Sequence, residues 1–439
     1  MATIITGSSH AQPVGAWFDS MPLTRGHWAI GVTLFIAFLI EAWEMMILIL
    51  NAGSIAAEFA LTTEQVGFLI SAIFLGMIPG SIIWGRLSDA IGRKRCLLLS
   101  VGLYAIFPLL SAFAPSVEFL WAVRFCCGVV LAGALVVTFP LFAELLPLNV
   151  RGQGTVFLSA GWPVGMLAAI AGTALLTQYG WRVTLGSSTV LALWSLAIWR
   201  AVPESPYWLS EQGRFDQAEG VVLRISNGAV VSKISRTADV TKKTSIFEIF
   251  RKSVRKTTII QTVVNFCFSW GYWGLTSWLP ALLEERGLKG GEGLGFLALS
   301  ALFMFPGYVT ASFLTGRLGR KKVMTAFVFL ATVSGFGFAR SSAMTDLYVW
   351  NFALSFFTVG AWGIWNAWLG EIYATRTRGQ GVAWGVMTQR IANSVAPIAI
   401  GGVLATSTFL QTVSFISLFL ALTFCAALLL PETEGQILT

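Results

Sequence analysis

Long apolar runs recur along this chain, and short polar or charged segments separate them. A helix needs roughly 17 to 25 mostly apolar residues to cross the hydrocarbon core of a bilayer. Twelve runs come close to that length, which predicts an all-α membrane protein with twelve spans. We place the spans at 28–50, 65–84, 96–114, 119–140, 153–176, 183–200, 257–282, 294–315, 323–339, 346–369, 381–404 and 409–430.

The second half of the chain repeats short motifs of the first half. Residues 144–154 read ELLPLNVRGQG and residues 371–381 read EIYATRTRGQG, an offset of 227 residues. Gly92-Arg93-Lys94 returns at the same offset as Gly319-Arg320-Lys321. Because separate motifs agree on one offset, we expect two pseudo-symmetric six-helix bundles. The predicted divisions are an N-terminal segment at 1–27, a first bundle at 28–202, a central segment at 203–256, a second bundle at 257–430 and a tail at 431–439.

Lys and Arg residues are distributed unevenly over the predicted loops. Only four of the 29 Lys and Arg residues lie in loops on the side opposite the termini, and these are Arg182, Arg286, Lys289 and Arg340. Loops rich in Lys and Arg stay on the cytoplasmic side of a membrane. We therefore expect both termini and the central segment to be cytoplasmic, in a multi-pass protein of the cell (inner) membrane. This topology accounts for the net charge of +8, so no nucleic-acid partner is expected.

The composition excludes a soluble enzyme. Of the 439 residues, 56% are hydrophobic and 11% are charged, which leaves too few polar residues to cover a water-facing surface. Both histidines, His10 and His27, precede the first span, and the cysteines form no C-x-x-C pair, so neither a metal site nor a catalytic site is expected. No phosphate-binding loop occurs, so ATP-driven transport is not expected. A duplicated membrane bundle usually binds its substrate between its halves at mid-depth, which favours a transporter.

Several motifs carry a resemblance to a known family. Residues 85–95, GRLSDAIGRKR, resemble the loop signature of the major facilitator superfamily, and residues 316–321 are a shorter copy without the Asp. Residues 203–209, PESPYWL, are similar to a segment of sugar and organic-ion porters, and residues 124–128 fit the fourth-helix pattern R-x-x-x-G. The resemblance covers the whole chain and is closest to bacterial aromatic-acid and metabolite:proton symporters. It implies the major facilitator fold, coupling to protons and no cofactor.

The first span contains two acidic residues. Glu41 and Glu44 are three residues apart and share a helix face, where the symporters named above carry D-x-x-D. Two carboxylates close together in a low-dielectric environment do not both ionise easily, so one of them can carry a proton. The alternative is a static ion pair with Arg124 in the fourth span, and an arginine that exchanges partners would combine both roles. Glu41, Glu44 and Arg124 are therefore the candidates for proton coupling.

Arg390 lies inside the eleventh span, and its counterpart at the repeat offset is Pro163. A guanidinium is permanently charged and can hold a carboxylate through two hydrogen bonds. Asn393, about one turn further along, shares its helix face. The resemblance also associates a basic residue in this helix with anionic substrates. We expect Arg390 and Asn393 to bind a substrate carboxylate, with a helix-packing ion pair to Glu41 or Glu44 as the alternative for Arg390.

Tryptophans are clustered in the seventh and tenth spans. At helical spacing and next to glycines, they could form a wall on which a flat ligand stacks. The alternative for each of them is ordinary helix packing. Trp28 and Trp278, near helix ends, are expected to anchor their helices at the membrane interface. The candidate stacking residues are Trp270, Trp273, Trp362 and Trp365, with Asn366 beside them.

The repeated loop motifs are expected to act as conformational latches. Gly85 would allow two helices to approach closely. Exposed ion pairs contribute about 0–1 kcal/mol each, which is enough to bias two states that differ by a few kcal/mol. The expected pairs are Asp89 with Arg93, Glu144 with Arg151, and Glu371 with Arg378.

Together these observations favour a proton-coupled symporter that imports a small organic monocarboxylate, preferably aromatic or heteroaromatic, by alternating access. The expected partners are this carboxylate and the lipid bilayer, and we expect a monomer. One alternative is transport of a sugar acid, a dicarboxylate or an organic cation, with Glu41 and Glu44 as counter-ions of the cation. Another is a transporter-like sensor that binds without transport. An enzyme is not expected, because no nucleophile–base pair can be assembled without a histidine in the body of the chain.

Overall fold

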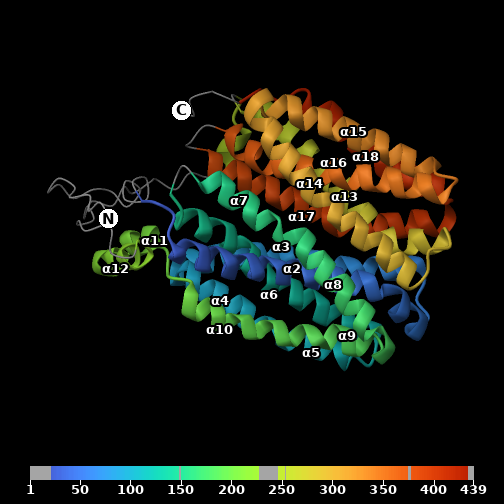
Figure 1. Ribbon diagram of the computed structural model, residues 1–439, viewed down its shortest axis with the longest axis horizontal. Coiled ribbons are helices and arrows are strands. Elements are labelled where there is room, and N and C mark those ends of the chain that lie inside the picture. Colours follow the sequence, from blue (N-terminus) through green and yellow to red (C-terminus); the bar gives the residue numbers. More distant parts are fainter. Residues whose placement is uncertain (1–20, 148–149, 227–245, 253, 374–376, 434–439) are drawn as a thin grey trace.

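The computed structural model describes residues 21–147, 150–226, 246–252, 254–373 and 377–433. Parts of the expected N-terminal segment, central segment and tail therefore lie outside the described residues. The described chain is helical almost throughout, and its helices form two bundles that lie side by side (Figure 1). The all-α, two-bundle architecture expected from the sequence is confirmed.

The first bundle contains the first six predicted spans, of which the third, fifth and sixth are divided by short breaks. Prolines account for two of these breaks. A proline ring clashes with the carbonyl of the residue four positions earlier. The helices before Pro108 and Pro163 each end at that residue. The helices are α2 (Arg25–Phe59), α3 (Thr63–Ile91), α4 (Arg93–Tyr104), α5 (Ile106–Ala112), α6 (Val117–Glu144), α7 (Arg151–Ser159), α8 (Gly161–Leu176), α9 (Trp181–Ser187) and α10 (Trp194–Ala201), with 3₁₀ turns at Thr177–Tyr179 and Ser188–Leu193.

The second bundle is built from six longer helices. Within the described residues, nine helical stretches are long and apolar enough to cross a membrane. The other three predicted spans are also helical: 183–200 is divided into short pieces, and 257–282 and 381–404 are less apolar. The helices are α13 (Arg255–Glu285), α14 (Gly291–Leu318), α15 (Arg320–Arg340), α16 (Met344–Glu371), α17 (Arg378–Thr406) and α18 (Phe409–Ala427).

Two short helices of the central segment, α11 (Pro206–Glu211) and α12 (Phe215–Ile225), lie at one end of the first bundle (Figure 1). The indole N–H of Trp208 donates to the carbonyl of Asp89 at 2.8 Å. The hydroxyl of Thr24 donates to the carbonyl of Ile225 at 2.6 Å. These bonds attach α11 to the end of α3 and α12 to the start of α2. We call this end of the molecule the α11/α12 end.

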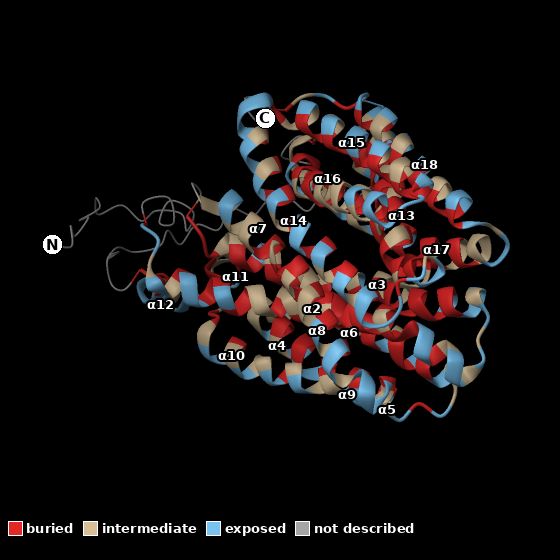
Figure 2. Ribbon diagram, turned by 45° about the vertical axis from the view of Figure 1, so that its right-hand side comes forward, coloured by how far each residue is buried: buried red, intermediate tan, exposed pale blue. Residues whose placement is uncertain are grey.

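Glycines allow close helix packing within each bundle. A Cβ atom at Gly76 of α3 would lie 2.0 Å from the carbonyl oxygen of Phe125 in α6. In the corresponding pair of the second bundle, a Cβ atom at Gly307 of α14 would lie 2.3 Å from the carbonyl oxygen of Phe356 in α16. Figure 2 shows buried residues on the inward sides of the helices and exposed residues on their outer sides. Large apolar side chains are among the exposed ones, for example Val309 at 67%. Apolar outer faces of this kind suit contact with lipid.

The two bundles touch mainly through α3 and α17. A Cβ atom at Gly67 of α3 would lie 2.4 Å from the carbonyl oxygen of Pro397, and the indole N–H of Trp278 donates to the same carbonyl at 3.0 Å. Trp278 is only 3% exposed, so the expectation that it anchors α13 at the membrane interface is wrong. Trp28, the other residue expected to be an interfacial anchor, is 58% exposed. Because Gly67 lies near the start of α3 and α11 is attached to its end, this contact is remote from the α11/α12 end.

Candidate functional site

Arg390 lies on the inner face of α17, at the boundary between the bundles. Its helix exposes Ile391 and Val395, whereas Arg390 is 7% exposed and Asn393 is buried as well. The Nη1 group of Arg390 donates to the Sδ atom of Met77 in α3, across the boundary, at 3.3 Å. Among the described residues, no carboxylate oxygen lies within 4.0 Å of the guanidinium. Arg390 is therefore a buried charge whose hydrogen-bond partner is an uncharged sulfur.

Glu41 of α2 interacts with Arg390 from the other bundle. Glu41 is 2% exposed, and its Oε2 atom has no hydrogen-bond partner among the described residues. The two side chains interact electrostatically, although their charged atoms are more than 4.0 Å apart. An acid of one bundle and a base of the other thus lie near each other across the boundary without a direct bond.

Glu44, one turn further along α2, is enclosed within the first bundle. Glu44 and Arg124 of α6 form an ion pair in which both side chains are fully buried. The Nη2 group of Arg124 also donates to the backbone carbonyl of Glu44 at 3.1 Å. The hydroxyl of Tyr104 in α4 donates to the Glu44 carboxylate, and the thiol of Cys127 lies 3.7 Å from it. For Glu44, the static ion pair considered as an alternative is present in this structure.

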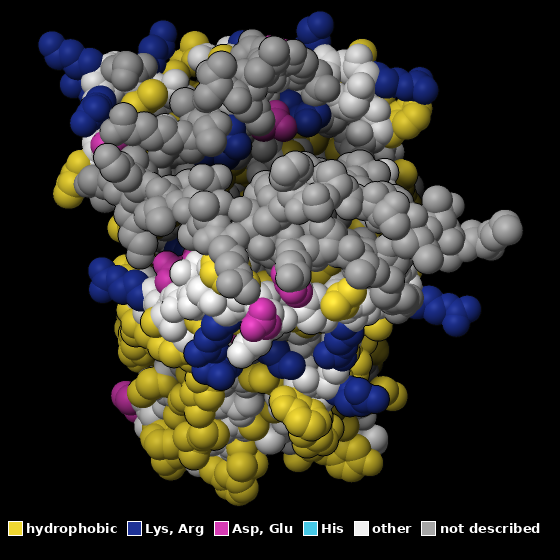
Figure 3. All heavy atoms as spheres, turned by 90° about the vertical axis from the view of Figure 1, so that its left-hand side faces the viewer, with side chains coloured by type: hydrophobic (Ala, Val, Ile, Leu, Met, Phe, Trp, Pro, Cys, Tyr) yellow, Lys and Arg dark blue, Asp and Glu magenta, His cyan; other side chains and the backbone are white. Residues whose placement is uncertain are grey.

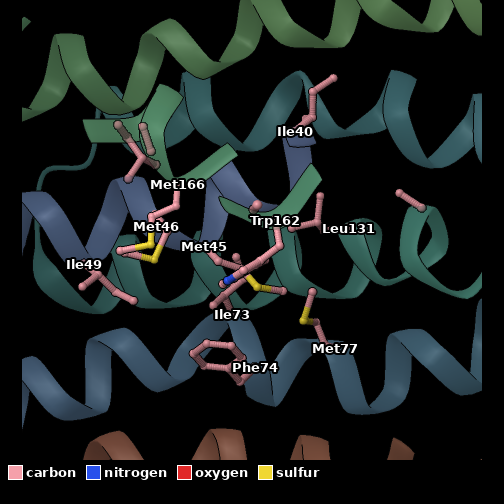
Figure 4. Close-up of a cluster of buried hydrophobic side chains, with 14 of the residues drawn as sticks. Ile40, Met45, Met46, Ile49, Ile73, Phe74, Met77, Leu131, Trp162 and Met166 are labelled. Carbon is pink, nitrogen blue, oxygen red and sulfur yellow. The ribbon is translucent and has the colours of Figure 1, made fainter. Parts of the chain in front are cut away.

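Aromatic side chains from both bundles meet beside Asn393. The ring centroid of Trp273 in α13 lies 5.3 Å from that of Trp162 in α8 and 4.6 Å from that of Phe74 in α3, in both cases edge to face. The indole N–H of Trp273 donates at 3.2 Å to the side-chain oxygen of Asn393, with the amide oriented to accept it. Figure 4 shows Trp162 extending from α8 toward Phe74 on α3, with Met77 beside them. The boundary therefore offers ring faces and edges next to polar groups.

Tyr272 links this aromatic group to the second bundle. Its hydroxyl accepts a hydrogen bond of 2.6 Å from the indole N–H of Trp162, a bond between the two bundles. The ring of Trp362 in α16 lies 5.7 Å from the ring of Tyr272. A pocket with several polar side chains opens beside Tyr272, and its lining includes Met166 of the first bundle with Ser300, Asn351, Thr358 and Ser417 of the second.

The other predicted stacking residues lie away from this boundary. Trp270 stacks on Phe419 inside the second bundle, with ring centroids 4.6 Å apart. Trp365 is fully buried in the same bundle, and its indole N–H donates to the side chain of Asn265 at 2.9 Å. Asn366, the next residue, is exposed. In this structure Trp270 and Trp365 have the packing role considered as an alternative, whereas Trp273 and Trp362 belong to the boundary group.

Sequence reasoning does not find Trp162, Tyr272, Phe74 or Met77, because none of them belongs to a motif. One signal leads to Trp162, however. Trp162-Pro163 occupies the repeat position of Gln389-Arg390. The residue that precedes the repeat counterpart of Arg390 is therefore an aromatic member of the boundary group.

Ion pairs at the bundle ends form between neighbouring helices. Arg93, at the start of α4, binds Glu144 at the end of α6 with an N–O distance of 2.9 Å. Arg320, at the start of α15, binds Glu371 at the end of α16 at 3.0 Å. These pairs occupy equivalent positions in the two bundles.

The predicted partners of both glutamates are therefore wrong. Arg151 does not bind Glu144 and instead donates to the hydroxyl of Tyr207 at 2.9 Å and to the carbonyl of Leu146. Likewise, the ion-pair partner of Glu371 comes from α15 and is not Arg378 at the start of α17. The spacing along the chain matched an ion pair, but packing between helices determines which arginine reaches each glutamate.

A glutamate also holds the start of one helix in each bundle. The side chain of Glu204 accepts a backbone hydrogen bond of 3.0 Å from the start of α4, and that of Glu432 accepts one of 3.0 Å from the start of α15. The residues before these helices, Gly92 and Gly319, have φ angles of 104° and 91°, which favour glycine. A Cβ atom at either glycine would also collide with the glutamate carboxylate.

The structure agrees with one expectation for the first loop signature, the ion pair of Asp89, and contradicts another, the close helix contact at Gly85. Asp89 forms the expected ion pair with Arg93, at 3.7 Å, and its side chain is 61% exposed. Gly85, by contrast, is not at a close helix contact, because a Cβ atom there would meet nothing within 4 Å. The close approach of α3 to α6 occurs at Gly76 and Gly80 instead.

Two repeated bundles with charged and aromatic residues buried at their boundary are typical of a secondary transporter. The sequence profile of the Major Facilitator Superfamily matches residues 34–364. The chain therefore belongs to the major facilitator superfamily. It is a multi-pass membrane transporter of small molecules that needs no cofactor, and it is not an enzyme.

Known proteins similar to this chain cover nearly all of it. It is 27% identical over 427 residues to the niacin transporter NiaP of Acinetobacter baylyi, covering 96% of this chain and 97% of that protein. It is 26% identical to the synaptic vesicle 2-related protein of Rattus norvegicus, covering 96% of this chain and 81% of that protein. A partially occluded, inward open structure of the xylose transporter XylE from E. coli matches it with a TM-score of 0.76 and 18% identity, covering 94% of this chain and 100% of that one. The last likeness establishes the fold.

Proposed function

We propose that this transporter is a proton-coupled symporter that imports a small aromatic or heteroaromatic monocarboxylate. The observation that carries the proposal is Arg390, which is buried at the boundary and has no carboxylate within 4.0 Å among the described residues. A charged side chain inside a membrane protein is costly without a partner. A substrate carboxylate would neutralise the guanidinium and accept two of its hydrogen bonds.

The aromatic side chains at the boundary support a flat substrate. Trp162, Trp273 and Tyr272 come from both bundles, and Trp273 binds Asn393, one turn from Arg390. Each favourable contact between aromatic rings contributes about 0.5–1.5 kcal/mol. The similarity to NiaP agrees with this chemistry, because niacin is a pyridine carboxylate.

The proposed orientation has the α11/α12 end and both termini in the cytoplasm of a cell (inner) membrane. Figure 3 views that end and shows Lys and Arg side chains around it. Positive residues of this kind favour the cytoplasmic side. Protons entering from outside would then drive import. We propose that a monomer is sufficient, because one chain supplies both bundles.

The proposal is tested by measuring ligand binding to the purified protein. The melting temperature would be recorded with nicotinate, benzoate, nicotinamide, gluconate, succinate and tetraethylammonium. We expect nicotinate and benzoate to raise it, and nicotinamide, which lacks the carboxylate, to have little effect. Arg390→Gln is expected to weaken nicotinate binding about 100-fold, which corresponds to about 2.8 kcal/mol, because charge-assisted hydrogen bonds are lost.

Arg317→Gln provides a matched control. Arg317 is an exposed arginine at the end of α14, and its guanidinium lies 4.1 Å from the ring centroid of Phe313. This variant is expected to bind nicotinate as the wild type does. Binding of tetraethylammonium that Arg390→Gln leaves unchanged, without binding of any acid, would contradict the proposal and favour an organic cation.

A further inference from the structure

The two acids of α2 have different surroundings, and this difference assigns them different roles. We propose that Glu41 alone carries the coupling proton and that the substrate carboxylate replaces Glu41 as the counter-charge of Arg390. One proton would then accompany one monoanion. This inference rests on the proposed function, because it requires a carboxylate at Arg390.

Glu44 is poorly suited to carry a proton that is loaded and released. Its carboxylate already accepts hydrogen bonds from Arg124 and Tyr104, and both it and Arg124 are fully buried. Protonating Glu44 would leave the charge of Arg124 without compensation inside the bundle, which is strongly unfavourable. All three side chains also belong to the first bundle, so a movement of one bundle against the other does not need to separate them.

Glu41 has the opposite surroundings. Its Oε2 atom lacks a hydrogen-bond partner among the described residues, and Arg390, on the other bundle, is the charged group with which it interacts. On the helices packed against α2, Arg124 of α6 is bound to Glu44, and Tyr272 of α13 is an uncharged group bound to Trp162. When Glu41 is ionised, its charge is therefore balanced across the boundary, at the place where the proposed substrate binds.

Charge balance at the boundary defines which states are favourable. In the empty site, ionised Glu41 and Arg390 sum to zero. With a monocarboxylate bound to Arg390, the sum is again zero only if Glu41 has taken up one proton. The two mixed states, an empty site with protonated Glu41 or a loaded site with ionised Glu41, bury one net charge and are disfavoured. When only the two neutral states are populated, each substrate molecule is transported together with one proton.

The proton pathway follows from this balance. A proton from the outer solution binds a Glu41 carboxylate oxygen as the substrate carboxylate binds Arg390. On the inner side the substrate leaves, Glu41 releases the proton to solvent, and its negative charge again compensates Arg390. No net charge moves with the substrate. A pH difference of one unit would therefore support about tenfold accumulation, and membrane potential would contribute nothing.

The experiment uses the full-length protein and nicotinate. In weakly buffered solution, a pH indicator would count protons taken up per nicotinate bound, at a pH where Glu41 is ionised in the empty site. We expect about one for the wild type and for Glu58→Gln, a matched control on the same helix whose side chain is exposed and paired with Arg182. For Glu41→Gln we expect no proton uptake and an affinity that stays constant over about two pH units.

Proteoliposomes would provide the second measurement. Glu41→Gln is expected to exchange labelled for unlabelled nicotinate but to lose accumulation driven by a pH gradient. Glu44→Gln is expected to lower the melting temperature while keeping proton uptake on binding. If Glu44→Gln does not fold, two measurements on the wild type still test the inference. They are the proton count and the response of nicotinate accumulation to an imposed membrane potential.

Three results would overturn the inference. They are proton uptake by Glu41→Gln equal to that of the wild type, pH-driven accumulation by that variant, and accumulation by the wild type driven by membrane potential alone. Absence of nicotinate and benzoate binding by the wild type is a different result, because it would reject the proposed substrate class before the role of Glu41 is measured.

Discussion

The ends of the two bundles are alike, whereas their middles differ. At the ends, Arg93 pairs with Glu144 and Arg320 pairs with Glu371, at 2.9 Å and 3.0 Å and at positions related by the repeat offset. In both bundles, a glutamate that follows a proline accepts hydrogen bonds from the helix beginning with that arginine. Equal contacts in both bundles indicate a shared mechanical role, which is to hold helix ends together within each bundle.

In the middle, the repeat positions hold different residues. Arg124, the partner of Glu44, corresponds to Asn351, which forms a hydrogen bond between uncharged groups in the second bundle. Arg390 corresponds to Pro163. The first bundle thus supplies both buried acids, and the second supplies the arginine at the boundary. The residues that are not repeated are therefore the ones to test for substrate and proton binding.

The largest expected effect concerns Arg124 and its counterpart Asn351. Arg124→Ala would leave Glu44 as an uncompensated buried charge, so we expect the free energy of unfolding to fall by about 3–5 kcal/mol. Asn351→Ala removes one hydrogen bond between uncharged groups and should cost about 1 kcal/mol. Melting temperatures of both purified variants measure the difference.

A double variant separates lost charge compensation from lost packing. Glu44→Gln combined with Arg124→Gln removes both charges, so it should recover much of the stability that Arg124→Ala loses. If Asn351→Ala is as damaging as Arg124→Ala, the middles of the bundles do not differ in the way described.

The next largest expected effect concerns two tryptophans of α13. Trp273 contacts Trp162 and Phe74 at the boundary, whereas Trp270 stacks on Phe419 inside the second bundle. We expect Trp273→Ala to raise the Kd for nicotinate about tenfold, equivalent to about 1.4 kcal/mol, because aromatic contacts with the ligand are lost. Trp270→Ala should lower the melting temperature and leave the Kd unchanged. Isothermal titration calorimetry of both variants measures this, and an equal rise in Kd for Trp270→Ala would extend the site into the second bundle.

The sequence predicts the fold well because its signals are local or repeated. Apolar length identifies the spans, and the offset of 227 residues identifies the two bundles. At the same offset, the arginines at the bundle ends have arginine counterparts, whereas Arg390 has no charged counterpart. A buried charge without a counterpart is therefore visible from the sequence alone.

Partners between helices are much harder to predict. Helical periodicity assigns Glu41 and Glu44 to one face, but a difference of one turn directs Glu44 toward α6 and leaves Glu41 near α17. Glu144 has an arginine at a suitable spacing along the chain, yet it binds Arg93 from a neighbouring helix. The hydrogen bond from Trp162 to Tyr272 joins two bundles, and no pattern within either helix specifies it. These contacts depend on tertiary packing.

The smallest expected effect tests the likeness of the bundle ends. Glu144→Gln and Glu371→Gln each remove one partially exposed ion pair, whose side chains are 20–24% exposed. Pairs of this kind contribute about 0–1 kcal/mol, so each variant should lower the free energy of unfolding by at most about 1 kcal/mol, and by equal amounts within error. Because both pairs lie within a bundle, the Kd for nicotinate should not change.

Double-mutant cycles make this comparison quantitative. Combining Glu144→Gln with Arg93→Gln, and Glu371→Gln with Arg320→Gln, isolates the coupling energy of each pair from other effects of the substitutions. Equal coupling energies would mean that the two ends stabilise their bundles to the same degree, as their geometry indicates. A coupling energy present in one bundle and absent from the other would show that repeated geometry does not imply repeated energetics. The ends would then differ functionally as the middles do.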